Sequence, residues 1–332
     1  MRIAVTGSIA TDHLMVFPGR FTDQLIADRL DRVSLSFLVD DLHIHRGGVA
    51  ANIAFGLAQL DLTPILVGAV GPDFADYRAW LESHGVDTAS VHVSATRHTS
   101  RFLCTTDESQ NQIASFYAGA MSEARDIDLA RVAARHGGLD LVLIAPNDPD
   151  AMLRHTRDCR AHGFRFAADP SQQLARLTGP QIRSLVEGAD LLFTNEYEHD
   201  MLLSATGWTR SDVLFRVGRW ITTLGENGVR IESGTEPPLT IPAVPTDAVV
   251  DPTGVGDAFR AGFLAGLSRQ TGIEQAARIG AALASVVLES AGGQEYLFAP
   301  EEFLARLTAT YGAAAATDIE HRVLGGKVSP QP

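Results

Sequence analysis

The sequence predicts an α/β protein with a mainly parallel central sheet, helices on both faces of that sheet, and a small β-sheet lid. Three observations lead to this prediction. Short aliphatic runs alternate with helical runs over most of the chain, which is typical of parallel sheets covered on both faces. Two stretches of strand-like sequence interrupt the alternation, and these predict the lid. The 332 residues are 45% hydrophobic and 20% charged, which suits a globular protein with a sizeable core.

The first part of the chain contains the strand that starts the sheet and the segments of the expected lid. Residues 3–6 form a short β-branched run ending at a glycine, and Asp12 follows in the next loop. Ligands bind α/β sheets at the carboxyl ends of parallel strands, so Asp12 is either a candidate site residue or an ordinary turn residue. An exposed strand is expected at 34–39. Further strands at 91–93, 101–106 and 112–117 are expected to form a small antiparallel set that is too small to fold alone.

From residue 126 onward the alternation of strands and helices is regular. We expect strands at 140–145, 164–168, 189–193 and 220–224, a hairpin at about 229–242, and helices at 149–162, 258–267, 273–289 and 300–312. These elements predict a single domain over residues 1–315, with lid segments inserted at about 14–46 and 90–118. Residues 316–332 are expected to form a tail that is poorly ordered from about residue 317.

Composition and charge exclude several classes of function. The formal net charge of −13 argues against a nucleic-acid or acidic-membrane partner, because phosphate backbones require excess Lys and Arg. The two cysteines, Cys104 and Cys159, have no metal-ligand or disulfide spacing. His43 and His45 lack a nearby third ligand, so no metal role is expected for them. The N-terminus starts on a strand, and no signal peptide or transmembrane run is apparent, so a cytoplasmic protein is expected.

The stretch Asp-Pro-Thr-Gly-Val-Gly-Asp at 251–257 carries the strongest chemical signal. Gly254, Val255 and Gly256 precede the helical run at 258–267, so their backbone N–H groups and the helix dipole would bind a phosphate. Asp257 in the first turn would repel that anion unless the chemistry needs a base there, and a hydroxyl awaiting phosphorylation supplies that need. The alternative is an ordinary glycine loop with a capping aspartate.

Three further pairs of residues have both a functional and a structural interpretation. Asn195 and Glu198 follow a strand and offer the oxygen ligands that Mg²⁺ prefers, or they form a helix cap with a solvated glutamate. Gly47 and Gly48 permit close backbone approach and hinge-like dihedrals, or they form a plain turn. Aromatic residues on the lid strands would stack a flat base or belong to the core. Neither a Walker A loop nor a Rossmann glycine motif is present.

Taken in order, these motifs resemble the PfkB/ribokinase sugar-kinase family over about residues 1–312, and within it the bacterial adenosine kinases. The residues that carry the resemblance are Gly47-Gly48 with Asn52, Asn195-x-x-Glu198 and the 251–257 stretch, together with the runs at 6–15, 33–41 and 168–177. The resemblance implies a ribokinase-like three-layer α/β/α sandwich.

The resemblance also implies a role for each matching residue. For catalysis it implies Asp257 as the base that activates a ribose 5′-hydroxyl, with the backbone of Gly254, Val255 and Gly256 as the anion hole. For the substrate it implies sugar contacts from Asp12, Gly48 and Asn52, a purine clamp from Phe102 and Phe116, and neighbouring contacts from Ser8, Ser36, Gln172, Gln173 and Arg176. For the nucleotide and the ions, it implies that Asn195 and Glu198 organise Mg²⁺ and phosphate. It further implies that Thr223, Gly225 and Gly228 line the ATP site and that Asp251 and Thr253 bind K⁺.

The implied function is adenosine kinase, which converts adenosine and MgATP into AMP and ADP in purine salvage. Related kinases often dimerise through the lid sheet, so a homodimer is expected. A sugar kinase acting on ribose or a sugar phosphate is the first alternative, but a sugar-phosphate site needs paired basic residues where Phe102 and Phe116 stand; Arg101 and Arg176 keep this alternative open. A non-catalytic nucleoside-binding protein is the second alternative, and the intact Asp257 argues against it.

Overall fold

The computed structural model describes residues 1–25, 35–246 and 248–324. Within these residues eight strands form the central sheet, in the order β14-β13-β12-β11-β10-β9-β1-β4. The strands from β12 to β4 are parallel, and β13 and β14 continue the sheet antiparallel at one edge. Their bounds are β1 (Ile3–Thr6), β4 (Ile65–Val67), β9 (Leu141–Ile144), β10 (Phe166–Ala168), β11 (Leu191–Asn195), β12 (Arg219–Thr223), β13 (Val229–Glu232) and β14 (Leu239–Ile241).

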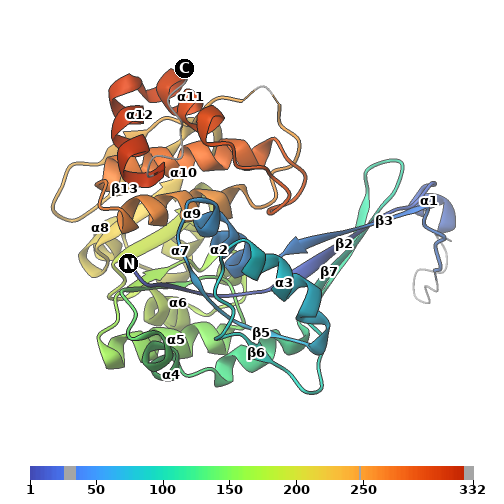
Figure 1. The fold of residues 1–332 in the computed structure, drawn as a ribbon. Helices are drawn as coiled ribbons and strands as arrows, with labels where there is room; N and C mark the ends of the chain where they lie inside the picture. Colours follow the sequence, from blue (N-terminus) through green and yellow to red (C-terminus); the bar gives the residue numbers. More distant parts are fainter. Residues whose placement is uncertain (26–34, 247, 325–332) are drawn as a thin grey trace.

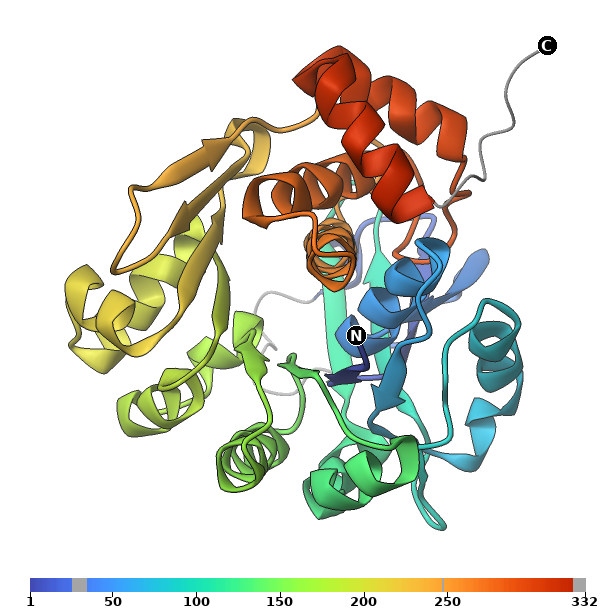
Figure 2. The same ribbon diagram turned by 60° about the vertical axis from the view of Figure 1, so that its left-hand side comes forward.

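Helices cover both faces of the sheet, because successive strand residues point to opposite sides. In β1, Ile3 and Val5 belong to one hydrophobic core and Ala4 to the other. The first core includes residues of α2 (Val49–Gln59), α3 (Ala75–Ser83), α9 (Val255–Ser268), α10 (Ile273–Leu288), α11 (Pro300–Tyr311) and α12 (Ala313–Ile319). The second includes residues of α4 (Leu129–His136), α5 (Pro149–His162), α6 (Gly179–Val186), α7 (Glu196–Thr206) and α8 (Arg210–Arg216). The predicted three-layer α/β/α sandwich is confirmed (Figures 1 and 2).

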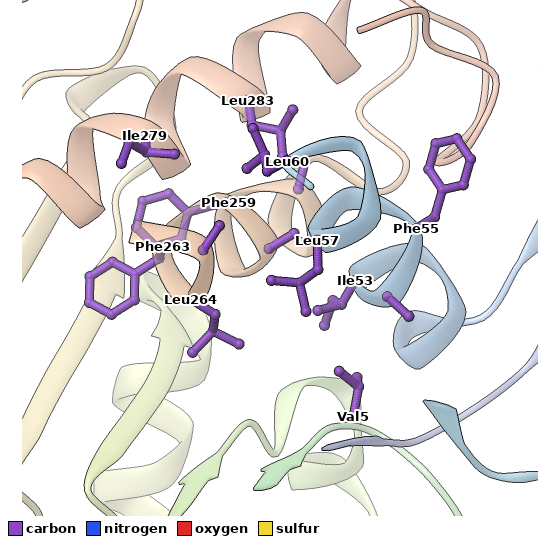
Figure 3. Packing of buried hydrophobic residues seen from close by; sticks show 14 of the residues in the cluster. Val5, Ile53, Phe55, Leu57, Leu60, Phe259, Phe263, Leu264, Ile279 and Leu283 are labelled. Atoms are coloured by element: carbon purple, nitrogen blue, oxygen red, sulfur yellow. The ribbon is translucent and has the colours of Figure 1, made fainter. Parts of the chain in front are cut away.

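Helix α9 lies in the middle of the first core and fixes the position of the 251–257 stretch. All its residues from Ala258 to Ala265 are buried, as expected for a helix that is apolar on every side. Figure 3 shows its packing against α10 and α2, through Phe259, Phe263, Leu264, Ile279, Leu283, Ile53 and Leu57. Contacts on several sides hold the N-terminus of α9 in place.

The lid is a four-stranded sheet that extends away from the body of the protein (Figure 1). Its strands are β3 (Asp41–Gly47), β2 (Ala10–Val16), β7 (Ser100–Thr106) and β8 (Gln112–Tyr117), in that order across the sheet. The pairs β2–β3 and β7–β8 are antiparallel, but β2–β7 is parallel. The predicted small lid sheet is therefore present, and it is mixed where a purely antiparallel set was expected.

The predicted lid strand at 34–39 is wrong. Residue 34 lies outside the described residues, and 35–39 form no strand; the strand is β3, which starts at Asp41 opposite Val16. The physical reason is aromatic packing, because the ring of Phe37 lies 5.0 Å from those of both Phe17 and Phe21. Phe21 begins the short helix α1 (Phe21–Gln24). These residues form a small apolar cluster and take no part in the β-ladder.

Two other expectations for the N-terminal part need correction. The run at 91–93 does not join the lid, because β6 (His92–Val93) pairs in parallel with β5 (Ala69–Val70) in a separate two-stranded sheet. The backbone N–H of His92 bonds to the carbonyl of Gly68, which anchors this strand to the body. Asp12 was expected in a loop and lies within strand β2 of the lid.

The expected tail begins as packed helix. Helix α12 crosses residue 315, and a π-helical turn, η6 (Glu320–Leu324), follows it. Ala316, Ile319 and Val323 are buried, and their spacing of three or four residues places them on one helical face. Residues 317–324 are therefore helical and packed in part against the body, and residues 325–332 lie outside the described part. None of the described helices is both long and apolar enough to cross a membrane.

Candidate active site

A cavity of about 480 Å³ lies between the lid and the carboxyl edge of the central sheet. Its volume is in the range usual for sites that bind small molecules. Most of the residues expected to hold substrate or to act on it line this cavity. They are Ser8, Asp12, Gly48, Asn52, Phe102, Phe116, Gln172, Gln173, Arg176, Thr253, Gly254 and Asp257, joined by Ala10, Val49, Met121 and Pro146. Ser36 is exposed and does not line the cavity.

The floor of the cavity comes from the ends of three adjacent strands. Ser8 follows β1, Pro146 follows β9, and Gln173 lies in η4 (Ser171–Ala175), which follows β10. These strands are neighbours in the sheet, so their carboxyl ends meet at one edge. The Ser8 hydroxyl accepts a hydrogen bond of 3.1 Å from the backbone N–H of Val49 and thereby holds the start of α2 against this edge.

Gly48 begins helix α2 at the point where the lid meets the body. Its φ is 93°, in the left-handed region, and an ideal Cβ would lie 2.6 Å from the carbonyl oxygen of Ser8. A side chain here would be strained and would also collide with the backbone. The sequence prediction of close backbone approach at Gly48 therefore has a geometric basis.

The ceiling of the cavity comes from one cross-strand row of the lid. The register pairs Asp12 with His45 on one side and with Phe102 on the other, and Phe102 with Phe116. Directly paired residues point to the same face of a sheet, so these four side chains share the face whose other members line the cavity. Phe102 is half-buried and Phe116 is 49% exposed, so neither ring is core. His45 shares this face through its pairing with Asp12 and does not itself line the cavity.

Asp257 lies at the deep end of the cavity in the first turn of α9. The N-cap of this helix is Gly254, with φ 79°, and the N–H groups of the first turn have no acceptor within the helix. The side-chain amide of Asn52 donates a hydrogen bond of 2.8 Å to Oδ2 of Asp257. A carboxylate and an anion-binding helix terminus therefore occur together at one end of the cavity.

Burial raises the pKa of Asp257 to about 7. The hydrogen bond from Asn52 and the charge of Arg260 oppose this shift, and the charges of Asp169 and Asp12 add to it. The side chain keeps partial exposure toward the cavity. A base that titrates near neutral pH is well matched to taking a proton from an alcohol at that pH.

A buried ion pair that no sequence motif predicted lies behind Asp257. Arg260 lies one turn further along α9, and Asp169 directly follows β10. Nη2 of Arg260 is 2.7 Å from Oδ1 of Asp169, and Nε is 2.5 Å from Oδ2; the two side chains are 7% and 1% exposed. Nη1 also donates to the carbonyl of Gly256 at 3.0 Å. The pair ties the first turn of α9 to the edge of the sheet, and a charged residue inside an apolar helical run was its only sequence signal.

The residues expected at the nucleotide lie further along the same edge. Asn195 and Thr223 are direct neighbours at the ends of β11 and β12. Gly225 begins the turn η5 (Gly225–Asn227), which Gly228 closes by donating its N–H to the Gly225 carbonyl at 3.0 Å. None of these four residues lines the cavity.

Asn195 and Glu198 form a helix cap. Asn195 Oδ1 accepts the backbone N–H of Glu198, and Glu198 Oε2 accepts that of Asn195, each at 2.8 Å. The helix cap of the structural alternative is therefore present, although Glu198 is half-buried and not fully solvated, and the role of this motif at Mg²⁺ stays a prediction. In the described part of the chain no three His, Cys, Asp or Glu side chains gather into a metal site.

Asp251 joins two segments that the sequence could not place relative to each other. Its Oδ1 accepts the N–H of Thr253 at 2.8 Å, and its Oδ2 accepts that of Gly292 at 2.9 Å. Burial tends to raise the pKa of Asp251, but these hydrogen bonds outweigh it and the pKa is lowered.

Comparison with known proteins places the chain in a family. A model described as pfkB family carbohydrate kinase matches residues 7–299. The nucleoside kinase of Methanothermobacter thermautotrophicus is 34% identical over 269 residues, which cover 80% of this chain and 85% of the relative. These likenesses support an ATP-dependent phosphotransferase that acts on a nucleoside or a sugar.

Solved structures agree with this assignment. The nucleoside kinase of Burkholderia thailandensis in complex with inosine matches with a TM-score of 0.81 and 31% identity, over 94% of this chain and 98% of that one. The same enzyme in complex with ADP-inosine gives a TM-score of 0.79 at 31% identity, over 94% and 96% of the two chains. The nucleoside kinase of Methanocaldococcus jannaschii, an archaeal member of the ribokinase family, gives 0.81 at 26% identity over 93% and 99%. The predicted ribokinase-like fold is confirmed, and the chain belongs to the pfkB family of carbohydrate kinases.

Proposed function

We propose that the protein is an adenosine kinase, which transfers the γ-phosphoryl group of ATP to the 5′-hydroxyl of adenosine and forms AMP and ADP. The observation that supports this most is the position of Asp257, whose pKa is about 7, at an anion-binding helix terminus in a cavity covered by two phenylalanine rings. The complexes of the Burkholderia relative with inosine and with ADP-inosine support a nucleoside and an adenine nucleotide as the two substrates.

The cavity wall offers a group that would recognise the purine. Gln173 is 6% exposed, and its Oε1 finds no hydrogen-bond donor among the described residues. A buried acceptor without a donor is unfavourable, so a ligand that brings an N–H group to it gains affinity. The exocyclic amine of adenine is such a donor. Phe102 and Phe116 would stack the faces of the base, and Asp12 and Asn52 would bind the ribose hydroxyls.

The positions of these side chains support the following reaction. Asp257 accepts the proton of the 5′-hydroxyl while the bond from that oxygen to the γ-phosphorus forms and the bond from phosphorus to the bridging β,γ-oxygen breaks. The N–H groups of Gly254 to Gly256 stabilise the charge on the transferred phosphoryl group. ADP leaves with the bridging oxygen, and Asp257 returns its proton to solvent. The lid excludes water that would otherwise compete with the 5′-hydroxyl.

Metal ions would assist at the nucleotide. Mg²⁺ is usually bound by one or two protein carboxylates together with phosphates and water. The half-buried Glu198 beside Asn195 could be the protein carboxylate of such a site. When bound, Mg²⁺ neutralises phosphate charge. Thr223, Gly225 and Gly228 would line the ATP site, and Asp251 with Thr253 would hold K⁺ next to the anion hole.

A sugar kinase acting on ribose or a sugar phosphate is the competing function. Arg176 favours it, since a guanidinium in the cavity wall could bind a phosphate. However, Arg176 is the single cationic residue among the described residues that line the cavity, and the two phenylalanine rings provide no charge or hydrogen bond for a sugar phosphate.

A substrate panel tests the proposal. ADP formation is measured with adenosine, inosine, guanosine, ribose and fructose 6-phosphate, each with and without K⁺. We expect adenosine to give the highest kcat/KM and K⁺ to raise it. Faster turnover of ribose or of a sugar phosphate would establish the competing function. Nucleoside binding without ADP formation from any acceptor would show that the protein is not a kinase.

We also propose that the protein is a homodimer formed through the outer face of the lid. Leu42, Ile44 and Ile113 are 53%, 58% and 47% exposed, and the register places them on the face opposite Asp12. A second copy of this face would bury them. Light scattering after size-exclusion chromatography should give twice the mass of the chain, and Ile44→Glu should reduce the measured mass to that of one chain. A monomeric wild-type protein would contradict the proposal.

A further inference from the structure

Gln294 is buried directly behind the residues already described, and no sequence motif pointed to it. Its side chain is 1% exposed. The Nε2 atom donates to Oδ1 of Asn52 at 2.9 Å and to the hydroxyl of Tyr77 at 2.5 Å. The Oε1 atom is buried and has no partner among the described residues. Both recorded hydrogen bonds of this side chain are therefore donated by its NH₂ group, and its carbonyl oxygen is left unsatisfied among the described residues.

The bond from Gln294 determines which end of the Asn52 amide faces Asp257. A carboxylate only accepts hydrogen bonds, so Asn52 must present its NH₂ group to Asp257, as the 2.8 Å contact records. That leaves Oδ1 of Asn52 pointing away, where it requires a donor. Gln294 supplies the donor. Without it, a rotation of the amide by 180° would place an oxygen against the carboxylate.

The other bond of Gln294 leads to the lid. The hydroxyl of Tyr77 accepts from Gln294 and donates to the carbonyl of Gly47 at 2.9 Å. Gly47 is the last residue of lid strand β3, and helix α2, which carries Asn52, starts two residues later. Burial raises the pKa of Tyr77, so its hydroxyl keeps the proton that this bond needs. A continuous line of hydrogen bonds thus runs from the end of β3 through Tyr77, Gln294 and Asn52 to Asp257.

The loop that carries Gln294 also packs against the anion hole. An ideal Cβ on Gly254 would lie 2.7 Å from Cα of Gly293, so the two backbones are in close contact. One residue earlier, Gly292 donates its N–H to Asp251. Gln294 is therefore held by a loop with contacts to the 251–254 stretch on one side and to α2 on the other.

We propose that Gln294 is a positioning residue: it fixes the Asn52 amide in the orientation that supports Asp257 as the base, and through Tyr77 it couples that orientation to the point where β3 of the lid joins the body. The inference rests on the proposed role of Asp257. It does not depend on whether the acceptor is a nucleoside or a sugar.

Four variants test this proposal. Gln294→Met keeps the length of the side chain and removes the donor, and Gln294→Glu replaces the donor with a negative charge. Tyr77→Phe removes the link to Gly47. Tyr296→Phe is the matched control, because the Tyr296 hydroxyl is also buried and has no partner in the described part of the chain. For each variant kcat and kcat/KM are measured from pH 5.5 to 9, together with the melting temperature.

We expect Gln294→Met to shift the midpoint of the acidic limb of the kcat/KM profile to higher pH by about one unit, because Asp257 loses the hydrogen bond from Asn52 that lowers its pKa. Activity at pH 6.5 should then fall about tenfold and recover largely at pH 8.5. Gln294→Glu should shift the midpoint at least as far, because it adds a negative charge near Asp257. The other charges that act on Asp257, those of Arg260, Asp169 and Asp12, are unchanged. Tyr77→Phe should raise the KM of the acceptor severalfold and leave the limb in place. Tyr296→Phe should change neither.

An equal loss of activity at every pH, or unchanged profiles in both Gln294 variants, would overturn the proposal. Either result would show that Gln294 contributes only to packing. If Gln294→Met does not fold, the profile of Gln294→Glu decides alone. Failure of the adenosine kinase proposal is recognised separately, because the wild-type protein would then show no turnover of nucleosides. The same profiles would be recorded with whichever acceptor it does phosphorylate.

Discussion

Replacing Asp257 by asparagine should abolish most phosphoryl transfer and preserve substrate binding. The substitution keeps the shape of the side chain and an oxygen that can still accept the 2.8 Å hydrogen bond from Asn52, but it removes the proton acceptor. Side chains that act as general bases contribute roughly 10²–10⁴-fold to rate, so we expect kcat to fall by a factor in that range. The dissociation constant of adenosine should change by about threefold or less, because the aromatic and ribose contacts remain.

The same substitution should stabilise the protein above neutral pH. The pKa of Asp257 is about 7 in the folded protein against an ordinary value of 3.8. Between these values the native state binds more protons than the unfolded chain, so the free energy of unfolding falls as pH rises. The three-unit difference corresponds to at most about 4 kcal/mol. Asp257→Asn removes this penalty, and its melting temperature should exceed that of the wild type at pH 8 and approach it at pH 5.

The assay combines ADP release, calorimetric binding of adenosine and thermal unfolding on one preparation. Asp200→Asn is a suitable control, since its side chain is 85% exposed on α7. Normal turnover by Asp257→Asn would refute the assignment of the base. Loss of both turnover and adenosine binding, with a lower melting temperature at pH 8, would show that the carboxylate has a structural role instead.

Two further predictions concern the neighbours of Asp257. Arg260→Met leaves the charge of Asp169 buried without a partner, which should cost about 3–5 kcal/mol in the free energy of unfolding by urea; the double variant with Asp169→Asn should recover most of that loss, and additive losses would contradict the buried pair. Phe102→Ala should weaken adenosine binding by about 1–3 kcal/mol, measured as a rise in KM, and Phe116→Ala should act similarly; an unchanged KM in both variants would exclude stacking.

The central sheet was predictable because its signals are local. Each parallel strand is a short apolar run next to a helical run, and the order along the chain implies the layers. The lid was harder to predict, because its pairing joins segments that are distant in the chain, as Asp12 with Phe102. In its strand β3, Asp41, His43 and His45 lie on the face toward the cavity, and Leu42, Ile44 and Arg46 lie on the outer face. The stretch around Phe37 has stronger strand propensity and forms an aromatic cluster instead.

The residues proposed to bind phosphate and substrate could be found from motifs, but the residues proposed to position them could not. Gln294 is 242 residues away from Asn52, and Arg260 is 91 away from Asp169. No short pattern contains either pair, because tertiary packing alone brings them together. A charge within the apolar run of α9 was a usable signal for Arg260. For Gln294, a glutamine after two glycines gave none.

The pH dependence of kcat/KM for adenosine tests the central claim most directly. If Asp257 is the base and its burial sets its pKa, the profile of the wild-type protein should rise with pH through a single limb with a midpoint near 7 and reach a plateau above it. The limb should be absent from the residual activity of Asp257→Asn. A wild-type profile that stays flat down to pH 5, or a limb that survives this substitution, would contradict the account.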